Sequence, residues 1–308
     1  MTDTAIFEDN RTRLRNIAYR MLGEMGTAED VVQEAWLRWR KAEKSEIRNP
    51  RAWLSTVTVR LSLDALRARR ARRETYVGPW LPEPLSPDDM RGLAADTPAA
   101  HAELASDLSM ALLHMLERLS PEERAAFILH DAFDCDYAEI ARTLGKAEPA
   151  CRKLVSRARD HVRTEHPRYS VNRESHQQLV ARFAEASASH DPSRVLPLLA
   201  DNVVFYSDGG GKVPAAINPV YGADHVSRLV AGLSRKLSKL GAWSLSFAQI
   251  SGQPGLVFTA GGEIISCMTV EVEDQRITAI YAMRNPDKLD RLSKALSHSS
   301  AHGSSASG

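Results

Sequence analysis

The stretch Asn49–Arg73, NPRAWLSTVTVRLSLDALRARRARR, has an apolar front half and a strongly basic back half. Apolar residues recur in it close to helical spacing, at Trp53, Leu54, Val57, Leu61 and Leu63. Asn49-Pro50 is a typical helix start, so one long helix is predicted. Residues 60–73 hold six arginines and a single acid, Asp64. Such a helix suits an anionic partner, most simply a nucleic-acid backbone, although a solvated helix with a basic end is the alternative.

Length and composition indicate a soluble protein of two or three domains. The chain has 308 residues, of which 43% are apolar, and no apolar run approaches the roughly 20 residues that span a bilayer. Its first residues, MTDTAIFEDN, lack the pattern of a secretory signal, so a cytoplasmic protein without membrane contact is expected. Three scattered cysteines form no CxxC pair. We therefore expect no disulfide framework, metal or cofactor.

Charge is segregated along the chain, although the net charge is only +1. Residues 1–75 carry 16 basic and 11 acidic side chains, whereas residues 76–105 carry 1 and 5. The acidic stretch could compete with DNA for the basic helix.

A second helix, over about residues 28–44, is predicted to have two functional faces. Thr27 is expected to cap it, because acids follow in the first turn. One face carries apolar residues spaced for burial, including Trp36 and Trp39. The other combines acidic, amide and apolar side chains: Asp30, Gln33, Glu34 and Leu37. This stripe suits a protein partner, and a plain exposed face is the alternative.

Residues 76–105 are rich in Pro, Gly and Asp, which predicts a linker without regular helix. Trp80 and Leu81 within it suggest that part of the linker docks on a surface. Beyond it, a helix is expected over 104–118, and Ser120-Pro121 opens another that runs to about Phe133.

A helix-turn-helix pattern follows, with one helix starting after Asp136, a turn at Gly145 and a second helix from about Glu148. Inward-facing positions are expected on the second helix at Ala150, Cys151, Leu154, Ala158 and Val162. Its other face is polar and basic, which is typical of a recognition helix. Such patterns also occur in proteins that do not bind DNA.

From Val171 onward, the sequence predicts strands as well as helices. Helices are expected over 175–189, 193–200 and 222–239. Strands are expected over 202–207, 243–250, 255–260, 263–273 and 276–283. Helices followed by a meandering antiparallel sheet predict an α+β domain separate from the helical front. The last residues, HSSAHGSSASG, are of low complexity and are predicted to be disordered.

Taken together, these segments resemble the extracytoplasmic-function group of sigma factors. Residues 27–39 resemble the helix that grips the clamp helices of the largest RNA polymerase subunit. Residues 49–73 resemble the segment that melts and reads the minus-10 promoter element, and residues 119–160 the domain that reads the minus-35 element. YVGPWLPEPL at 76–85, YSDGGGK at 206–212 and RNPDKL at 284–289 resemble signatures of a subgroup with a fused C-terminal SnoaL-like domain of the NTF2 fold.

The resemblance implies a division into five parts. These are a helical domain over 1–75, a Pro-rich linker over 76–104, a helix-turn-helix domain over 105–168, a SnoaL-like regulatory domain over 169–296, and a tail over 297–308. The expected fold class is two all-α domains followed by an α+β domain. The implied partners are core RNA polymerase and promoter DNA, bound by a monomer.

The resemblance also assigns roles to individual residues. Residues expected to contact the minus-10 element are Trp53, Arg60, Asp64, Arg67, Arg69 and Arg70. Trp53 could stack on a base, although a core position is the commoner use of such a tryptophan. Residues expected to contact the minus-35 element are Lys146, Arg152, Lys153, Ser156, Arg157 and Arg159. The polymerase contacts are the stripe Asp30, Gln33, Glu34 and Leu37.

The C-terminal domain is expected to regulate activity in cis, in place of a separate anti-sigma protein. Candidate regulatory residues are Trp80, Asp208, Gly209, Gly210, Gly211, Lys212, Asn285, Pro286 and Asp287. An enzyme using Asp208 or His225 as a base and an inert domain are the alternatives. The loop Asp208–Lys212 lacks the spacing of a phosphate cradle. A small-molecule ligand in the pocket of this domain, or a ligand-responsive repressor as the whole protein, also stays open.

Overall fold

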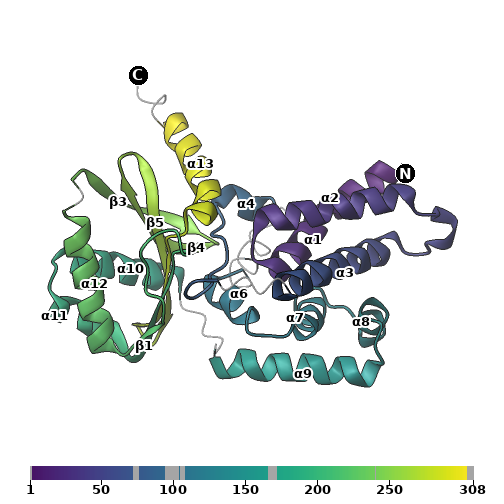
Figure 1. The fold of residues 1–308 in the computed structure, drawn as a ribbon, viewed down its shortest axis with the longest axis horizontal. Coiled ribbons are helices and arrows are strands. Elements are labelled where there is room, and N and C mark those ends of the chain that lie inside the picture. The colour runs from purple at the N-terminus through teal and green to yellow at the C-terminus, as the bar shows by residue number, and fades with distance from the viewer. Residues whose placement is uncertain are drawn as a thin grey trace. The chain divides into compact units, whose positions relative to one another are not determined.

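The computed structural model describes residues 2–71, 76–93, 104, 108–165, 172–239 and 241–303. The chain forms two compact units (Figure 1). The first comprises Met1–Thr75, Arg91–Leu108 and Leu112–Pro167, and the second comprises Tyr76–Met90, Ser109–Ala111 and Arg168–Gly308. The first is helical and the second combines helices with a sheet, so the predicted fold class is confirmed. Among the described residues, no helix is both long and apolar enough to cross a bilayer.

The first unit begins with three helices that pack on one another: α1 (Asp3–Leu22), α2 (Met25–Lys41) and α3 (Pro50–Ala71). Leu14, Leu54 and Trp39 are buried among them. The predicted cap at Thr27 is wrong, because α2 already begins at Met25. Gly23 adopts a left-handed conformation (φ 69°) that ends α1 and lets the next helix start almost at once. The predicted helix at 49–73 is confirmed by α3.

The second half of this unit contains α6 (Met110–Leu116), which crosses the division between the units, and α7 (Pro121–Phe127). A π-helical turn (Ile128–Ala132), α8 (Tyr137–Leu144) and α9 (Glu148–Glu165) follow. Capping boxes start α7 and α8, with Ser120 and Asp136 as caps, and Gly145 closes α8 in a left-handed conformation. The predicted helix-turn-helix is thus present.

The buried face of α9 is shifted slightly from the prediction, because Val155 is fully buried and Leu154 only half-buried. Cys151, Val155, Ala158 and Val162 are buried, but Ala150 is exposed. Ala150 lies about 100° around the helix from the buried Cys151, so it faces away from the core and its predicted inward position is wrong.

The second unit contains the segment 76–90, called the strap below, with the short helix α4 (Pro87–Arg91) at its end, where no helix was expected. Its helices are α10 (Arg173–Ala188), α11 (Pro192–Val195), α12 (Ala223–Leu237) and α13 (Pro286–Gly303). Its strands are β1 (Leu199–Asp208), β2 (Val220–Tyr221), β3 (Trp243–Ile250), β4 (Gln253–Ala260), β5 (Glu263–Glu273) and β6 (Arg276–Met283).

The strands form one sheet in the order β2-β1-β6-β5-β4-β3. β3 to β6 are the predicted antiparallel meander, and the bounds of β3, β5 and β6 agree with the prediction. The prediction is wrong for β1, which pairs parallel with β6. The long connection between them allows this parallel pairing, because α12 leads to β3 at the far edge of the sheet and the meander then returns to place β6 beside β1.

Each face of the sheet has its own core. α10 and α12 cover one face, where Phe183, Phe205 and Ile280 are buried (Figure 1). On the other face, α13 packs against β5 and buries Leu289 and Leu292. The predicted disordered tail, residues 297–308, begins within α13, which continues to Gly303, and residues 304–308 lie outside the described residues.

Glu271 gives the second unit a pH-dependent stability. Burial on β5 raises the pKa of its carboxyl to about 7, opposed by a hydrogen bond from Gln253 Nε2 (3.4 Å). Between the ordinary carboxyl pKa and about 7, the folded chain therefore holds a proton that the unfolded chain lacks. Stability from this group falls as pH rises through that window. Burial also lowers the pKa of His176 below the ordinary value of about 6.5, so the unfolded chain takes up a proton there more readily than the folded chain. The stability contributed by this group therefore falls as pH decreases below about 6.5.

We expect Glu271→Gln to raise the melting temperature of the second unit by a few °C at pH 8, and by much less at pH 5. The amide stays neutral at both pH values, whereas the buried carboxylate must ionise at pH 8. Differential scanning calorimetry of the full chain measures the effect. Glu263→Gln, at an exposed position of the same strand, is the control and should show no such difference. An equal gain at both pH values would contradict the assignment.

Candidate functional site

The three signature segments of the sequence meet around one buried ion pair in the second unit. Asp208, at the end of β1, lies 2.9 Å from Lys288 Nζ, in the first turn of α13. Their side chains are 0% and 6% exposed, respectively. The strap supplies the remaining neighbours of the pair. A buried pair of this kind is stable only if other hydrogen bonds satisfy its remaining lone pairs and protons.

The carboxylate of Asp208 accepts hydrogen bonds from four donors. Oδ1 accepts from the hydroxyl of Tyr76 (2.6 Å) and the backbone N–H of Gly210 (2.9 Å). Oδ2 accepts from the backbone N–H of Leu81 (2.9 Å) and from Lys288. Two of these four donors belong to the strap, so the strap completes the solvation of the buried carboxylate.

The ammonium group of Lys288 is enclosed by the strap as well. It donates to the carbonyl of Leu81 (2.6 Å) and lies over the rings of Trp80 and Tyr76, 4.0 and 4.9 Å from their centroids. Aromatic faces stabilise a desolvated cation. Asn285 extends the network by donating from Nδ2 to the Tyr76 hydroxyl (2.9 Å). Strap residues thus contact both charges of the pair.

The glycine loop is needed for close packing. A Cβ on Gly210 would lie 2.3 Å from Asn285 Nδ2, and one on Gly209 would lie 2.4 Å from the Val213 carbonyl oxygen. Gly210 and Gly211 also have positive φ values of 60° and 71°. The loop therefore admits no side chain at the position where it brings Gly210 N–H to Asp208.

The other predicted regulatory residues lie at the start of α13. Asn285 caps this helix through Oδ1, which accepts from the N–H of Asp287 (3.1 Å), and Pro286 occupies its first position. Lys212 forms an exposed ion pair with Asp287 (2.5 Å). The structure thus brings the predicted set together, with Lys212 and Asp287 at its surface.

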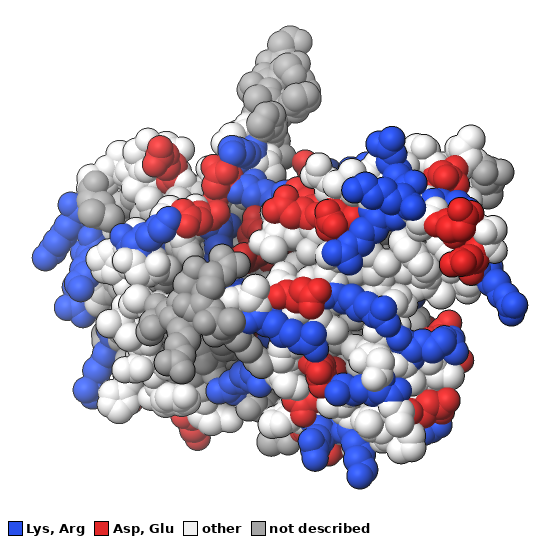
Figure 2. Space-filling model, turned by 45° about the vertical axis from the view of Figure 1, so that its right-hand side comes forward, with Lys and Arg blue, Asp and Glu red and all other residues white. Residues whose placement is uncertain are grey.

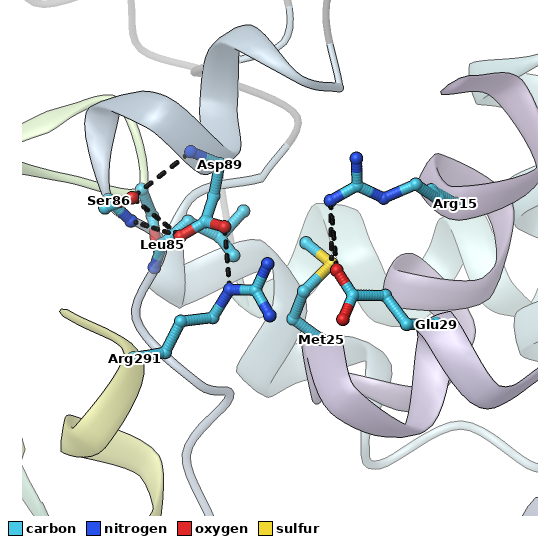
Figure 3. A network of polar contacts seen from close by, with 8 residues as sticks. Arg15, Met25, Glu29, Leu85, Ser86, Asp89 and Arg291 are labelled. Carbon is cyan, nitrogen blue, oxygen red and sulfur yellow. Dashed lines mark hydrogen bonds and ion pairs between the residues drawn. The ribbon is translucent and has the colours of Figure 1, made fainter. Parts of the chain in front are cut away.

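Two further contacts hold the strap. The N–H of Leu85 donates to the Ser251 hydroxyl (3.1 Å), and the N–H of Ser251 donates to the Leu85 carbonyl (2.8 Å). Asp89 accepts from Arg291 Nε (2.7 Å) while its other oxygen accepts from Ser86 (Figure 3). Leu81 and Leu85 are fully buried. The predicted docking of the linker therefore involves the whole strap.

Sequence reasoning missed Tyr76 and Lys288 as members of this network, and it singled out Leu81 only as a docking residue of the linker. All three lie inside the quoted signature segments, so the segments were the available signal. Lys288 stands between two acids of an amphipathic helix, where a lysine is usually solvated. Nothing local in the sequence indicates that its charge is buried.

In the first unit, the predicted polymerase stripe lies on one face of α2. Asp30, Gln33 and Leu37 are exposed, and Leu37 retains 41% of its accessible surface. Glu34 lies between them and pairs with Arg38 (3.0 Å). One turn before Gln33 on α2, Glu29 pairs with Arg15 of α1 (3.3 Å; Figure 3). An exposed leucine among polar side chains is a plausible contact for another protein.

The basic residues of α3 already have partners within the first unit. Arg60 donates from Nε and Nη2 to the carbonyls of Thr143 and Arg142, both at 2.9 Å. Arg67 pairs with Glu122 (3.2 Å) and with Asp64 (3.6 Å). These contacts join α3 to the helix-turn-helix segment. DNA contact by Arg60 or Arg67 would therefore require them to leave these partners.

The remaining residues predicted for the minus-10 element are less available. Trp53 is half-buried against Trp39, with ring centroids 5.5 Å apart, which fits the core alternative. Arg69 is partly buried, and the side chain of Arg70 lies outside the described residues.

Four of the six residues predicted for the minus-35 element share the exposed face of α9: Arg152, Lys153, Ser156 and Arg157. Arg152 pairs with Glu148 one turn earlier on the helix (3.6 Å), whereas the other two residues pair with acids of other elements: Arg159 with Asp131 (2.5 Å) and Lys146 with Glu122 (3.0 Å). Basic and acidic side chains are interspersed over the face drawn in Figure 2. Attraction to DNA would therefore come from local groups of cations.

A cavity of about 540 Å³ lies on the α10 and α12 side of the sheet, within the second unit. Its walls are mainly apolar, and Arg284 and Lys236 are the charged residues that line it. Asp208 and His225, the catalytic candidates of the enzyme alternative, are not among the lining residues. Asp208 lies on the opposite face of β1 with its donors, and His225 is exposed.

Comparison with known proteins identifies one family of similar proteins. Residues 6–72 match the family described as Sigma-70 region 2, and residues 109–162 the one described as Sigma-70, region 4. The chain is 41% identical over 292 residues to the ECF RNA polymerase sigma factor SigJ of Mycobacterium tuberculosis, which covers 92% of this chain and 91% of the relative.

Two further similarities cover nearly the whole chain. A probable ECF RNA polymerase sigma factor SigI of Mycobacterium tuberculosis is 31% identical over 296 residues, covering 94% of this chain and 95% of the relative. The crystal structure of the SigJ protein aligns with a TM-score of 0.72 and 37% identity, covering 94% of this chain and 98% of that one. The similarity therefore includes the second unit.

We expect Lys288→Met to lower the free energy of unfolding of the second unit by roughly 3–5 kcal/mol, because it leaves the buried Asp208 carboxylate without its counter-charge. Urea unfolding of the full chain measures the loss. Adding Asp208→Asn to this variant should recover part of it, since the uncompensated charge is then gone. Arg228→Met, which removes an exposed partner of Asp224, is the control and should leave the transition unchanged. A Lys288→Met chain as stable as the parent would contradict the role of the pair.

Proposed function

The chain belongs to the extracytoplasmic-function (ECF) group of sigma-70 factors, and on that premise we propose that its second unit controls transcription initiation in cis by holding the strap. The single observation that carries the proposal is the pair Asp208–Lys288, whose hydrogen bonds are completed by the strap.

Docking of the strap on the second unit can affect promoter binding because of where the strap lies in the chain. The match to region 2 ends at residue 72 and the match to region 4 begins at residue 109, so the strap lies between the two promoter-reading regions. A segment bound to the second unit cannot act as a free linker. Release of the strap would lengthen the free connection and allow the two regions to separate further.

The proposal assigns each surface of the first unit a partner. RNA polymerase and promoter DNA are the partners of ECF sigma factors. We assign the stripe on α2 to the clamp helices of the largest polymerase subunit, α3 to the minus-10 element and the exposed face of α9 to the minus-35 element. Arg60 and Arg67 take part after they leave their partners in the helix-turn-helix segment. The protein acts as a monomer in the cytoplasm, where transcription takes place.

The second unit is assigned a binding role and no catalysis. Asp208, the candidate base, already accepts from four donors and is fully buried, so it has no free lone pair directed at a substrate. Its side chain and the cavity lie on opposite faces of β1, because Phe205 and Ser207 line the cavity. An aspartate held in this way positions the strap and does not abstract protons.

We expect the double variant Tyr76→Phe/Asp89→Asn to raise the yield of run-off transcripts several-fold. It weakens two side-chain contacts of the strap, with Asp208 and with Arg291, but keeps the ion pair intact. A released strap favours separation of the regions that Arg60 and Arg67 hold together. The measurement uses core polymerase and a library of candidate promoters.

The matched control is Tyr221→Phe/Asp224→Asn, which makes the same two changes at exposed positions of the second unit. It should leave the yield unchanged. If the strap variant transcribes like the parent chain, control through the strap is wrong. If no version produces transcripts and all bind DNA tightly without polymerase, the polymerase-dependent function itself is wrong.

We expect Gln33→Ala/Glu34→Ala to weaken binding to core polymerase at least tenfold, because both residues lie in the proposed contact stripe. Fluorescence anisotropy of labelled chain titrated with core polymerase measures the affinity. Glu174→Ala/Gln177→Ala makes the same two changes on exposed turns of α10 and should have no effect. Equal affinities of the two double variants would remove α2 from the polymerase interface.

A further inference from the structure

The cavity of the second unit has a clear separation of apolar and polar walls. Its volume of about 540 Å³ is in the range of small-molecule sites. Helices α10 and α12 supply apolar walls, and the sheet adds aromatic side chains. Apolar members of the lining include Phe183, Leu229, Leu233, Trp243, Leu256 and Phe258.

Polar groups gather where three neighbouring strands end. Ser207 on β1 pairs in register with Ala282 on β6, and Arg284 follows β6 on the same face two residues later. Ser266 on β5 donates to the carbonyl of Met283 (3.0 Å), which places it beside Arg284. Ser207, Ser266 and Arg284 all line the cavity. One end of the cavity is therefore polar and carries a positive charge.

Two of these groups lack the partners that such groups normally have. Ser207 is 3% exposed, yet its hydroxyl has no hydrogen-bond partner within the described part of the chain. Arg284 donates from Nη1 to the carbonyl of Pro214, but no described carboxylate pairs with it. Burial lowers the pKa of Arg284. The Ser207 hydroxyl and the remaining N–H groups of Arg284 are therefore donors that a ligand in the cavity could accept from.

The charge of the lining selects the sign of a ligand. The lining residues, all in the described part of the chain, include no Asp, Glu or His. The nearby imidazole of His190 contacts Ser234 Oγ (3.0 Å) but does not line the cavity. Lys236 is exposed and adds a second cation. The lining thus favours an anion over a cation and provides no base for catalysis.

We propose that this cavity binds an apolar monocarboxylic acid, with its carboxylate on Arg284 and Ser207 and its hydrocarbon part between α10, α12 and the sheet. A guanidinium and a hydroxyl together provide the donors that a carboxylate accepts. The apolar walls gain from burying a hydrocarbon chain or ring. Binding of this ligand does not depend on the proposed control through the strap.

The test compares three ligands of equal chain length by isothermal titration calorimetry on the full chain: decanoate, 1-decanol and decyltrimethylammonium. The two ionic ligands are used below their critical micelle concentrations, and 1-decanol below its solubility limit. Decanoate should bind saturably and at least tenfold more tightly than 1-decanol. Decyltrimethylammonium should bind more weakly than 1-decanol. Arg284→Gln should weaken decanoate at least tenfold and leave 1-decanol unchanged. Ser207→Val should weaken decanoate to a smaller extent.

Arg228→Gln is the matched control, because it removes an exposed arginine of α12 that does not line the cavity. It should leave the affinity for decanoate unchanged. If Arg284→Gln does not fold, the acid and alcohol comparison on the parent chain decides alone. Equal binding of decanoate and 1-decanol, stronger binding of the cation, or no saturable binding of decanoate would each overturn the proposal.

Discussion

The second unit depends on the burial of one ion pair. Asp208 and Lys288 lie 80 residues apart in the sequence, and burying either charge without the other would be strongly destabilising. Even as a pair they are incomplete, because each also needs a hydrogen-bond partner from Leu81. The strap is therefore bound by more than apolar packing. Its position follows from the need to satisfy two buried charges, which also makes its docking specific to one register.

Local sequence patterns predicted the elements whose cause is local. The capping residues Ser120 and Asp136 marked helix starts that the structure reproduces, since a cap acts within one turn. Strand-like runs of residues located β3, β5 and β6. The parallel pairing of β1 with β6 was not predictable in this way, because it depends on a connection through α12 and on burial of both faces. The early start of α2 likewise depends on the conformation of Gly23.

In the candidate site, too, features with a local cause could be predicted from the sequence, and those that depend on distant residues could not. The signature segments indicated which parts of the chain matter, but the role of Lys288 becomes visible only when Asp208, about 80 residues away, is placed beside it. Arginines of α3 illustrate the converse. From the sequence, Arg60 and Arg67 are expected to donate hydrogen bonds to phosphate groups of DNA. In the folded chain, backbone carbonyl oxygens and the Glu122 carboxylate accept these hydrogen bonds instead. A guanidinium group has the same donors for each of them, so composition alone cannot separate a folded contact from a nucleic-acid contact.

Arg284 connects the two regions of interest in the second unit. Its side chain lines the cavity, while its backbone N–H donates to the carbonyl of Asp208 (2.7 Å). The next residue, Asn285, holds the hydroxyl of Tyr76. A ligand can bias the strap only if it binds the docked and released states with different affinity, and any such coupling must act equally in both directions. Arg284 at the polar end of the cavity and Asn285 beside the ion pair share one peptide bond. A displacement of Arg284 would therefore alter its hydrogen bond to Asp208 and the hydrogen bond of Asn285 to Tyr76, on which strap docking depends.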